Sequence, residues 1–330
     1  MDAVAALLEI ATLLERERAS RYRAKAFRQA ASVVTGLPAE VLADPERVRA
    51  VKGIGASTFE VIRQAQQGIV PSYLVELRGE VEPEIRSALR ARLRGDLHAH
   101  TDWSDGTTPI ETMVDAARAL GHEYLAITDH SPRLRVARGL SAERLREQIP
   151  LVRGQSGDGF TVLAGIEVDI LEDGALDQHP ELLAELDIVV ASVHSKLRMD
   201  AAPMTRRMLA AVADPHVNVL GHCTGRLVQG ERGTRPPSQF DAQAVFAACA
   251  EHGVAVEINS RPERQDPPDE LIAIALAEGC LFSIDSDAHA PGQLSLLDHG
   301  AQRAEAAGVP AERIVTTWGL ERLRAWARSD

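Results

Sequence analysis

The sequence is poor in cysteine and has no long uninterrupted apolar stretch. Its three cysteines, Cys223, Cys249 and Cys280, lie in or beside apolar segments and lack the spacing of a disulfide framework. No run of about 18 apolar residues occurs, and the first residues, MDAVAALLEI, lack the basic start of a secretory signal. These absences argue against a membrane span, a membrane partner or a secreted protein, and we expect a cytoplasmic protein with buried thiols.

The composition is that of an ordinary globular protein, with 45% hydrophobic and 25% charged residues, and a length of 330 residues suggests two domains. Charge is divided unevenly along the chain. Residues 1–95 hold 15 Lys and Arg against 12 Asp and Glu, a net charge of +3. Because the whole chain has a net charge of −12, the remaining residues carry −15. Several divalent ions at one site would dominate the local field, so the acidity of the second part does not exclude a phosphate substrate.

The segment from Asp96 to Gly106, DLHAHTDWSDG, organises the rest of the chain. His98 and His100 end an extended apolar stretch and are one residue apart, so in a strand they project from the same face. Both imidazoles can then reach one metal ion. Asp105 stands before Gly106, which suits a turn that folds the carboxylate back over the same site.

Six further apolar segments follow, separated by stretches of helix length, and five of them end in or near a side chain that can ligate a metal. They are Tyr124–His130, Phe160–Val168, Asp187–His194, Val217–His222, Val254–Asn259, which carries no ligand, and Leu281–Asp287, followed by His289. Seven short strands alternating with helices predict a parallel α/β barrel with its site at the carboxyl ends of the strands.

Nine side chains near these strand ends are candidate metal ligands: His98, His100, Asp105, His130, Glu167, His194, His222, Asp287 and His289. A single histidine at a strand end is more often structural, but six of the eleven histidines together with three carboxylates favour a shared centre. The other five stand in polar contexts and are expected at the surface: His122, His179, His216, His252 and His299. Mixed imidazole and carboxylate ligands suit zinc, manganese or iron.

The first 95 residues show helical periodicity throughout. Apolar residues recur at helical spacing from Val4 to Leu14 and from Ala26 to Val34. Residues 51–57, VKGIGAS, predict a glycine hairpin between two helices, where backbone N–H groups of Gly53 and Gly55 can face a phosphate beside Lys52. A purely structural turn explains the two glycines equally well.

The motifs of both parts resemble known families. Residues 4–78, through YRAKAFRQAASVV and VKGIGASTFEVIRQAQQG, resemble the N-terminal helical domain of family X DNA polymerases with its helix-hairpin-helix. Residues 96–325 resemble the PHP (polymerase and histidinol phosphatase) domain of the bacterial members, through DLHAHTDWSDG, AITDHS, GIEVDI, ASVHSKLRM, VLGHCTGRL, VEINSRPER and SDAH in that order. The polymerase palm is absent. We therefore expect an α/β protein, with a small all-α helix-hairpin-helix domain at residues 1–93 and a distorted (β/α)7 PHP barrel at 94–330.

The resemblance implies three metal ions. One would be held by His98, His100, Glu167 and Asp287, a second by Glu167, His194 and His222, and a third by Asp105, His130 and His289. Three departures from the family patterns are present. Val61 stands where some family X domains have a Schiff-base lysine, so lyase activity is not expected; Ser57 replaces a lysine common in DNA-binding hairpins; and Cys223, which replaces a proline, is not expected to be a ligand.

Other residues near the strand ends have two readings each. Asp129 either orients a metal-bound imidazole or caps the segment that follows it. Lys196, Arg226, Asn259 and Arg261, with Arg198, either bind substrate phosphate or are ordinary surface and strand-end residues.

These residues predict metal-dependent phosphoester hydrolysis by a metal-bound water, with two to three divalent ions (zinc, manganese or iron). The resemblance implies a DNA end as substrate, attacked as a 3′-phosphatase or a 3′-to-5′ exonuclease. A small-molecule phosphomonoesterase such as a histidinol phosphatase is the first alternative. A non-catalytic DNA-binding module is the second.

Overall fold

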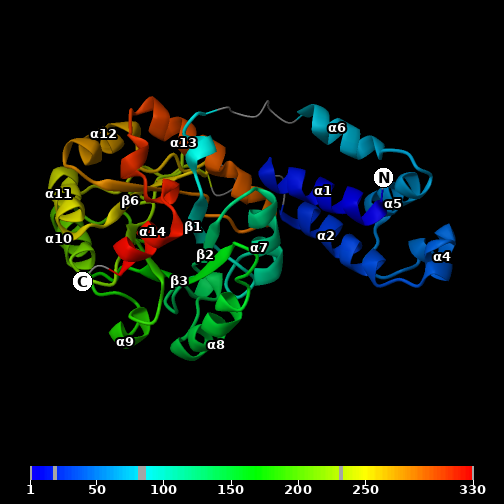
Figure 1. The fold of residues 1–330 in the computed structure, drawn as a ribbon, viewed down its shortest axis with the longest axis horizontal. Coiled ribbons are helices and arrows are strands. Elements are labelled where there is room, and N and C mark those ends of the chain that lie inside the picture. The colour runs from blue at the N-terminus through cyan, green and yellow to red at the C-terminus, as the bar shows by residue number, and fades with distance from the viewer. Residues whose placement is uncertain (1, 18–20, 81–86, 230–232, 329–330) are drawn as a thin grey trace. The chain divides into compact units, whose positions relative to one another are not determined.

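The computed structural model describes residues 2–17, 21–80, 87–229 and 233–328. Its chain divides into two compact units (Figure 1). One consists of Met1–Glu84 with Pro291–Gln293, and the other of Ile85–Ala290 with Leu294–Asp330. Each unit has a hydrophobic core of its own.

The first unit is helical, as predicted. Its helices are α1 (Ala3–Arg16), α2 (Arg21–Thr35), α3 (Ala39–Leu42), α4 (Pro45–Arg49), α5 (Ala56–Gln66) and α6 (Ser72–Glu80). The apolar stripe of α1, with Leu7, Ile10 and Leu14, is buried against Phe27 of α2 and Ile62 of α5. Burying each of these side chains contributes roughly 1.5–3 kcal/mol, so the core formed by the amphipathic faces holds the unit together.

The glycine hairpin forms between α4 and α5. Gly53 has a φ of +99°, a left-handed conformation that side chains disfavour. A Cβ atom on it would also lie 3.3 Å from Val33 Cγ2 of α2. The glycine therefore lets the hairpin turn tightly against α2.

The second unit is a nearly closed parallel barrel of seven strands that follow one another in chain order (Figure 1). The strands are β1 (Gly95–Ala99), β2 (Tyr124–Ile127), β3 (Thr161–Asp169), β4 (Ile188–Ser192), β5 (Val219–Leu220), β6 (Ala255–Asn259) and β7 (Leu281–Asp285). The helices between and after them are α7 (Ile110–Ala119), α8 (Ala142–Arg153), α9 (Pro180–Leu183), α10 (Ala201–Val212), α11 (Ala242–His252), α12 (Asp269–Ala277), α13 (Leu297–Ala306) and α14 (Leu320–Ala327). The predicted α/β barrel is confirmed.

The first and last strands meet through a few bonds rather than a full ladder. The His100 N–H donates to the carbonyl of Ala288 at 2.8 Å. The Leu97 N–H donates to the side chain of Asp285 at 2.9 Å. Segments nearly 200 residues apart in the sequence therefore lie side by side at the point where the barrel closes.

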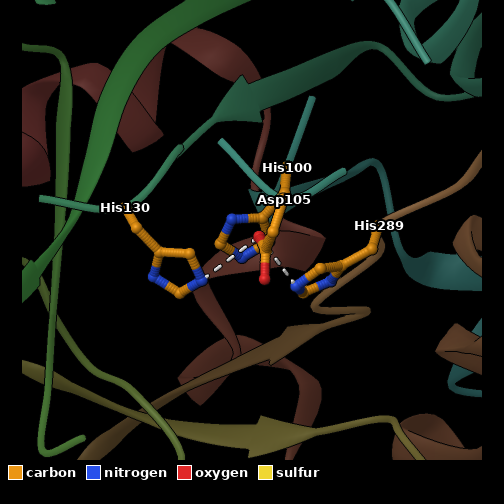
Figure 2. Close-up of side chains that lie close together, drawn as sticks. All are labelled: His100, Asp105, His130 and His289. Atoms are coloured by element: carbon orange, nitrogen blue, oxygen red, sulfur yellow. Dashed lines mark ion pairs between the residues drawn. The ribbon is translucent and has the colours of Figure 1, made fainter. Parts of the chain in front are cut away.

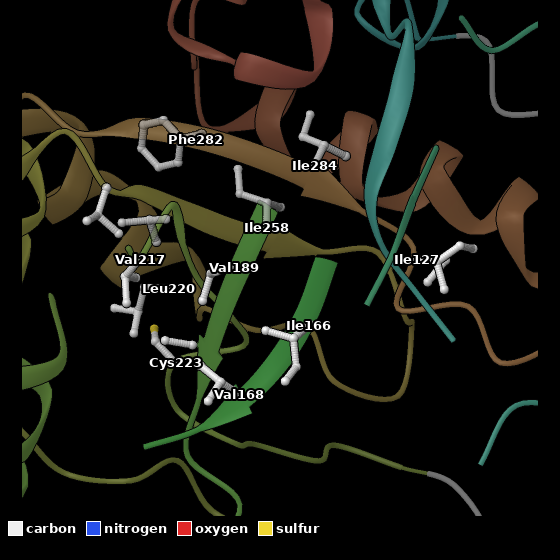
Figure 3. Close-up of a cluster of buried hydrophobic side chains, with 14 of the residues drawn as sticks. Ile127, Ile166, Val168, Val189, Val217, Leu220, Cys223, Ile258, Phe282 and Ile284 are labelled. Carbon is white, nitrogen blue, oxygen red and sulfur yellow. The ribbon is translucent and has the colours of Figure 1, made fainter. Parts of the chain in front are cut away.

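Alternation along the strands separates two apolar layers. In β2, Leu125 and Ile127 belong to the outer layer packed beneath the helices, while Tyr124 and Ala126 point inward. Figure 3 shows part of the outer layer. The inner layer is capped by Trp318 and Leu323 near the C-terminus, where the Tyr124 hydroxyl donates to the Trp318 carbonyl at 3.1 Å. This packing fills the amino-terminal end of the barrel and leaves the carboxyl ends of the strands for a site.

The three cysteines are free and buried, as expected. In the part of the chain that the structure describes, no helix is long and apolar enough to cross a membrane. One surface prediction is wrong: His122 is only 7% exposed. It lies three residues after the end of α7, between Gly121 and Glu123, and these neighbours gave no sign that its ring is buried.

The buried ring of His122 is expected to make the barrel sensitive to acid. Burial, aided by the charge of Arg90, lowers the pKa of His122 from 6.5 to about 4. In the unfolded chain the ring takes up a proton near pH 6.5, whereas in the folded barrel it stays neutral down to about pH 4. The neutral ring therefore stabilises the fold fully above pH 6.5, and this contribution is lost as the pH falls toward 4.

Replacing His122 with leucine should remove this dependence. Between pH 7 and pH 5 the wild type should lose about 2 kcal/mol more unfolding free energy than His122→Leu. Urea unfolding followed by tryptophan fluorescence measures the difference, because Trp103, Trp318 and Trp326 all lie in the barrel unit. The exposed His252→Leu should behave as wild type; equal losses in all three proteins would contradict the assignment.

Candidate metal centre

The predicted ligands gather at the carboxyl ends of the strands around the buried carboxylate of Glu167, which β3 carries. Five imidazoles that come from four other strands or the loops after them have a ring nitrogen close to one of its two oxygens. The separations are 3.3 Å for His98, 3.6 Å for His100, 2.8 Å for His130, 3.2 Å for His194 and 2.8 Å for His222. Donor atoms about 3.4 Å apart are what ligands at about 2.1 Å from a shared tetrahedral ion require.

A second group of side chains surrounds Asp105. Its Oδ1 lies 3.4 Å from Nε2 of His130 and 3.3 Å from Nε2 of His289. Figure 2 shows these three side chains and the ring of His100 turned toward one another. His100 Nε2 also lies 3.5 Å from Asp287 Oδ1. The loops after β1, β2 and β7 thus supply one continuous cluster.

All nine predicted side chains fall into four overlapping groups whose donor atoms lie within 4.8 Å of one another. The groups are His100, Asp105, His130 and His289; His98, His100 and Asp287; His98, Glu167 and His222; and His130, Glu167 and His194. The sharing differs from the implied partition in three respects. His98 groups with His222, His194 groups with His130, and His100 also joins the group around Asp105.

Many of these donor atoms are buried and have no hydrogen-bond partner among the described residues. They include His98 Nε2, His130 Nδ1, both ring nitrogens of His100 and His222, and both oxygens of Glu167. Leaving a buried polar atom unpaired costs about 1–3 kcal/mol. Several unpaired atoms at one place therefore indicate that a further group binds there. A divalent cation satisfies nitrogen and oxygen donors together, and the residues present fit that role.

The charges of the cluster act strongly on one another. Burial alone would raise the pKa of Glu167, but the neighbouring imidazoles, His194 foremost, hold that pKa well below its usual range. Burial would lower the pKa of His194, yet Glu167 and Asp169 raise it to about 10. The pKa of His100 falls to about 3 because of burial and the adjacent rings of His289 and His130. Protons on the imidazoles therefore balance the negative charge of the buried carboxylates, and a bound cation would displace those protons.

Two carboxylates behind the ligands orient their rings, and sequence reasoning missed both. Glu257 Oε1 lies 2.6 Å from His98 Nδ1, and its other oxygen accepts from the backbone N–H of His222. Asp169 contacts His194 Nδ1. Each leaves the Nε2 of its partner ring turned toward Glu167. A signal was available: Glu257 interrupts apolar β6, and Asp169 follows Glu167 by two residues and so shares its face.

The role predicted for Asp129 needs correction. Among the residues that the structure describes, its carboxylate contacts no imidazole. It accepts from the Thr101 N–H at 2.9 Å, the Thr101 hydroxyl at 2.6 Å, the Ser104 hydroxyl and Gln148 at 2.6 Å. Asp129 thus fixes the Thr101–Ser104 segment that leads to Asp105, because the turn after β1 folds back over the end of β2.

The predicted phosphate-binding residues divide into two kinds. Lys196 is exposed two residues after His194. Arg261 lies at the rim, with Nη1 3.2 Å from His289 Nδ1 and Nε 2.8 Å from Glu263. Arg226 instead donates to the backbone carbonyls of Arg264 and Gln265.

Asn259 and Arg264 contact carboxylates of the centre instead of facing solvent. Asn259 donates to Glu257 and to Asp287, each at 3.2 Å. Arg264, which sequence reasoning did not single out, lies 3.0 Å from Asp287 Oδ2. Asp287 itself has a φ of +51°, a conformation that aspartate tolerates better than most residues. Its carboxylate is therefore held from two sides and aimed at His100.

The helical unit has a separate cavity of about 470 Å³ beside the glycine hairpin. Gly53, Gly55, Ser57, Arg23 and Tyr73 are among its lining residues. The N–H of Gly55 donates to the Thr58 hydroxyl at 2.9 Å, and Lys52 is exposed next to the hairpin. Val61 also lines this cavity. Its apolar side chain has no amine with which to form a Schiff base.

Comparisons with known proteins bear on both units. The PHP domain family matches residues 96–261, and the helix-hairpin-helix domain family matches residues 1–68. The chain is 33% identical to the DNA polymerase/3'-5' exonuclease PolX of Bacillus subtilis over 267 residues, which are 79% of this chain and 46% of that protein. The chain therefore spans less than half of that relative. It is 30% identical to a probable phosphatase of Edwardsiella ictaluri over 230 residues, 67% of this chain and 88% of that protein.

One of the solved structures to which the chain is similar is the histidinol phosphate phosphatase of Lactococcus lactis complexed with zinc, L-histidinol and phosphate. It is 18% identical, with a TM-score of 0.48, and the match covers 65% of this chain and 94% of that one.

The contact between Glu257 and His98 can be tested through metal affinity. Glu257→Gln keeps the shape of the side chain but loses the charge. Its amide NH2 group must face either His98 Nδ1 or the donors of His222 and Asn259. Affinity for Zn²⁺ or Mn²⁺, measured by competition with a chelator, should fall about 10- to 100-fold. Glu270→Gln, on the exposed side of α12, should bind as wild type. Unchanged affinity in Glu257→Gln would mean that the carboxylate does not support the ligand.

Proposed function

Because the chain belongs to the PHP-domain family of metal-dependent phosphoesterases, we propose that it hydrolyses a phosphate ester at the carboxyl end of the barrel, and that this ester lies at a DNA end. The observation that carries the proposal is the convergence of nine imidazole and carboxylate side chains. Five of them have buried donor atoms with no hydrogen-bond partner among the described residues: His98, His100, His130, Glu167 and His222. Nine donors are too many for one tetrahedral or octahedral ion. We therefore assign two to three divalent ions, of zinc, manganese or iron, to these side chains.

When bound, such ions lower the pKa of a water molecule and stabilise the charge on phosphoryl oxygens. The residues of the chain supply the arrangement. Glu167 bridges the groups from the middle, and Asp105 and Asp287 supply charge on the side of His289. Glu257 and Asp169 fix which nitrogen of His98 and His194 faces the centre.

Substrate phosphate would be held by cations at the rim. Lys196 and Arg261 are the side chains we assign to this role. Lys196 follows His194 by two residues, Arg261 lies 3.2 Å from His289 Nδ1, and both carry donors suited to phosphoryl oxygens. Asn259 and Arg264 are assigned to holding Asp287, and Arg226 to holding the loop that bears Arg264.

The helical unit supports DNA as the substrate. It matches the helix-hairpin-helix family, residues 1–95 carry a net charge of +3, and a cavity lies beside the hairpin. Contacts of the hairpin with backbone phosphate would set affinity without reading sequence. The Gly55 N–H already donates to the Thr58 hydroxyl, so we assign the phosphate contact to Lys52 beside the hairpin. The relative named DNA polymerase/3'-5' exonuclease matches 79% of this chain. We therefore propose a 3′-phosphatase or a 3′-to-5′ exonuclease.

A small-molecule phosphomonoesterase is the second candidate. It is favoured by the probable phosphatase of Edwardsiella ictaluri, most of whose length is matched by 230 residues of this chain. A substrate panel separates the two: an oligonucleotide with a 3′-phosphate, a recessed DNA end and histidinol phosphate.

The metal assignment predicts the composition and activity of the purified protein. Elemental analysis should find two to three transition-metal ions per chain, and a chelator should abolish hydrolysis until Zn²⁺, Mn²⁺ or Fe²⁺ is restored. His98→Ala with His100→Ala should lose activity, whereas His179→Ala with His252→Ala, both exposed, should keep it. Fewer than one ion in protein never exposed to chelator, or turnover by the first variant at the wild-type rate, would refute the centre.

The hairpin assignment predicts a change in DNA affinity alone. Lys52→Glu should raise the KM for an oligonucleotide about fivefold, or about 1 kcal/mol, and reduce the slope of log KM against log salt by about one. Cleavage of a small phosphoester should not change. Lys25→Glu makes the same charge change on an exposed position of α2 that does not line the cavity. If both variants raise KM equally, only net charge matters and the hairpin has no specific role.

A further inference from the structure

The segment between β2 and α8 forms a loop that is closed at its base. The Leu140 N–H donates to the His130 carbonyl at 2.7 Å, so residues 131–139 leave the barrel and return to it at one point. A Cβ atom on Gly139 would lie 1.8 Å from the Ser131 carbonyl oxygen, so only glycine permits this approach. We call residues 131–139 the arginine loop. Its base residue, His130, is one of the nine side chains of the metal centre.

The arginine loop carries positive charge and an exposed apolar side chain. Its sequence, SPRLRVARG, contains three arginines and no acidic residue. Arg133, Arg135 and Arg138 are exposed. Val136, between them, is 90% exposed, the most of any large hydrophobic residue in the described part of the chain. A lone exposed apolar residue needs no explanation, but one flanked by arginines beside a metal centre offers a binding surface.

Several contacts hold the loop against the centre. Arg138 donates to the carbonyls of Asp102, at 3.0 Å, and Ser104, and these residues lead to Asp105. Arg144 of α8 donates to the Arg138 carbonyl at 2.8 Å and to the Trp103 carbonyl, with its guanidinium 5.8 Å from the Trp103 ring.

The other side of the loop is held by Asp177. This carboxylate accepts from the Ser131 hydroxyl at 2.9 Å and from the Arg133 N–H at 2.5 Å. Its oxygen therefore fixes the base of the loop, and the tip with Arg135 and Val136 stays free of these tethers. The loop is thus joined to His130 at its base and, through Arg138, to the segment that leads to Asp105.

We infer that the arginine loop binds the nucleic-acid strand that enters the metal centre, and this inference rests on the proposed function. In a substrate with a single phosphate, that phosphate would lie at the metal ions. No second phosphate would then be present for the arginines to bind. A strand has further phosphates for Arg133 and Arg135, and the sugar or base between them gives Val136 an apolar partner. The loop makes the barrel itself, and not only the helical unit, a contributor to binding of DNA.

The test compares two double variants in the full chain. Arg135→Ala with Val136→Ala removes the tip without touching the tethers or the centre. Arg324→Ala with Leu151→Ala is the matched control; Arg324 lies on α14, beyond the amino-terminal end of the barrel, and Leu151 is 50% exposed on α8. Fluorescence anisotropy with a labelled oligonucleotide, at several salt concentrations, measures equilibrium binding. KM and kcat for the oligonucleotide and for p-nitrophenyl phosphate measure turnover.

The loop variant should bind the oligonucleotide about tenfold more weakly, with a salt slope smaller by about one, and should show a matching rise in KM for that substrate. Its kinetics on p-nitrophenyl phosphate should equal those of the control. Unchanged anisotropy overturns the inference, as does an equal rise in KM for both substrates. If the wild type hydrolyses neither ester, the proposed function fails, and the anisotropy comparison still decides whether the loop binds the strand.

Discussion

The structure depends on one buried carboxylate surrounded by imidazoles. Glu167 faces five histidine rings that arrive from β1 and from the loops after β2, β4 and β5. An ionised carboxylate in such surroundings is costly unless positive charge accompanies it. The surrounding strands must therefore bring protons or cations to this point, and the positions of the other ligands follow from that requirement.

Buried polar groups extend well beyond the ligands themselves. Asp96 accepts from the His98 N–H and from Ser286, and burial raises its pKa to about 6. The neighbouring Asp285 accepts from the Leu97 N–H, and its pKa is raised well above the usual range. These two carboxyl groups join β1 to β7 beneath the centre. Burying these carboxyl groups lowers the stability of the folded barrel, but they hold the strands that carry the ligands in place, as is common at functional sites.

The strands and the nine side chains could be predicted because the rules involved are local. An apolar run ending in histidine identifies a strand and its carboxyl end, and in a parallel barrel those ends meet. The partners of Asp129 and Glu257 could not be predicted in this way. Whether a carboxylate reaches an imidazole or a neighbouring backbone depends on the curvature of the barrel and on how far each loop folds back. The burial of His122 likewise depends on where α7 ends against the sheet, which its own sequence does not specify.

Closure of the barrel between its first and last strands has a consequence for how the protein is made. His98 and His100 emerge early from the ribosome, whereas Asp287 and His289 follow almost 190 residues later, and the His100 N–H finds its carbonyl partner only at Ala288. Contacts so distant in sequence form slowly. A nascent chain therefore exposes an incomplete set of acidic and imidazole donors until Asp287 and His289 have been made, and the set is complete only when the last strand joins the first.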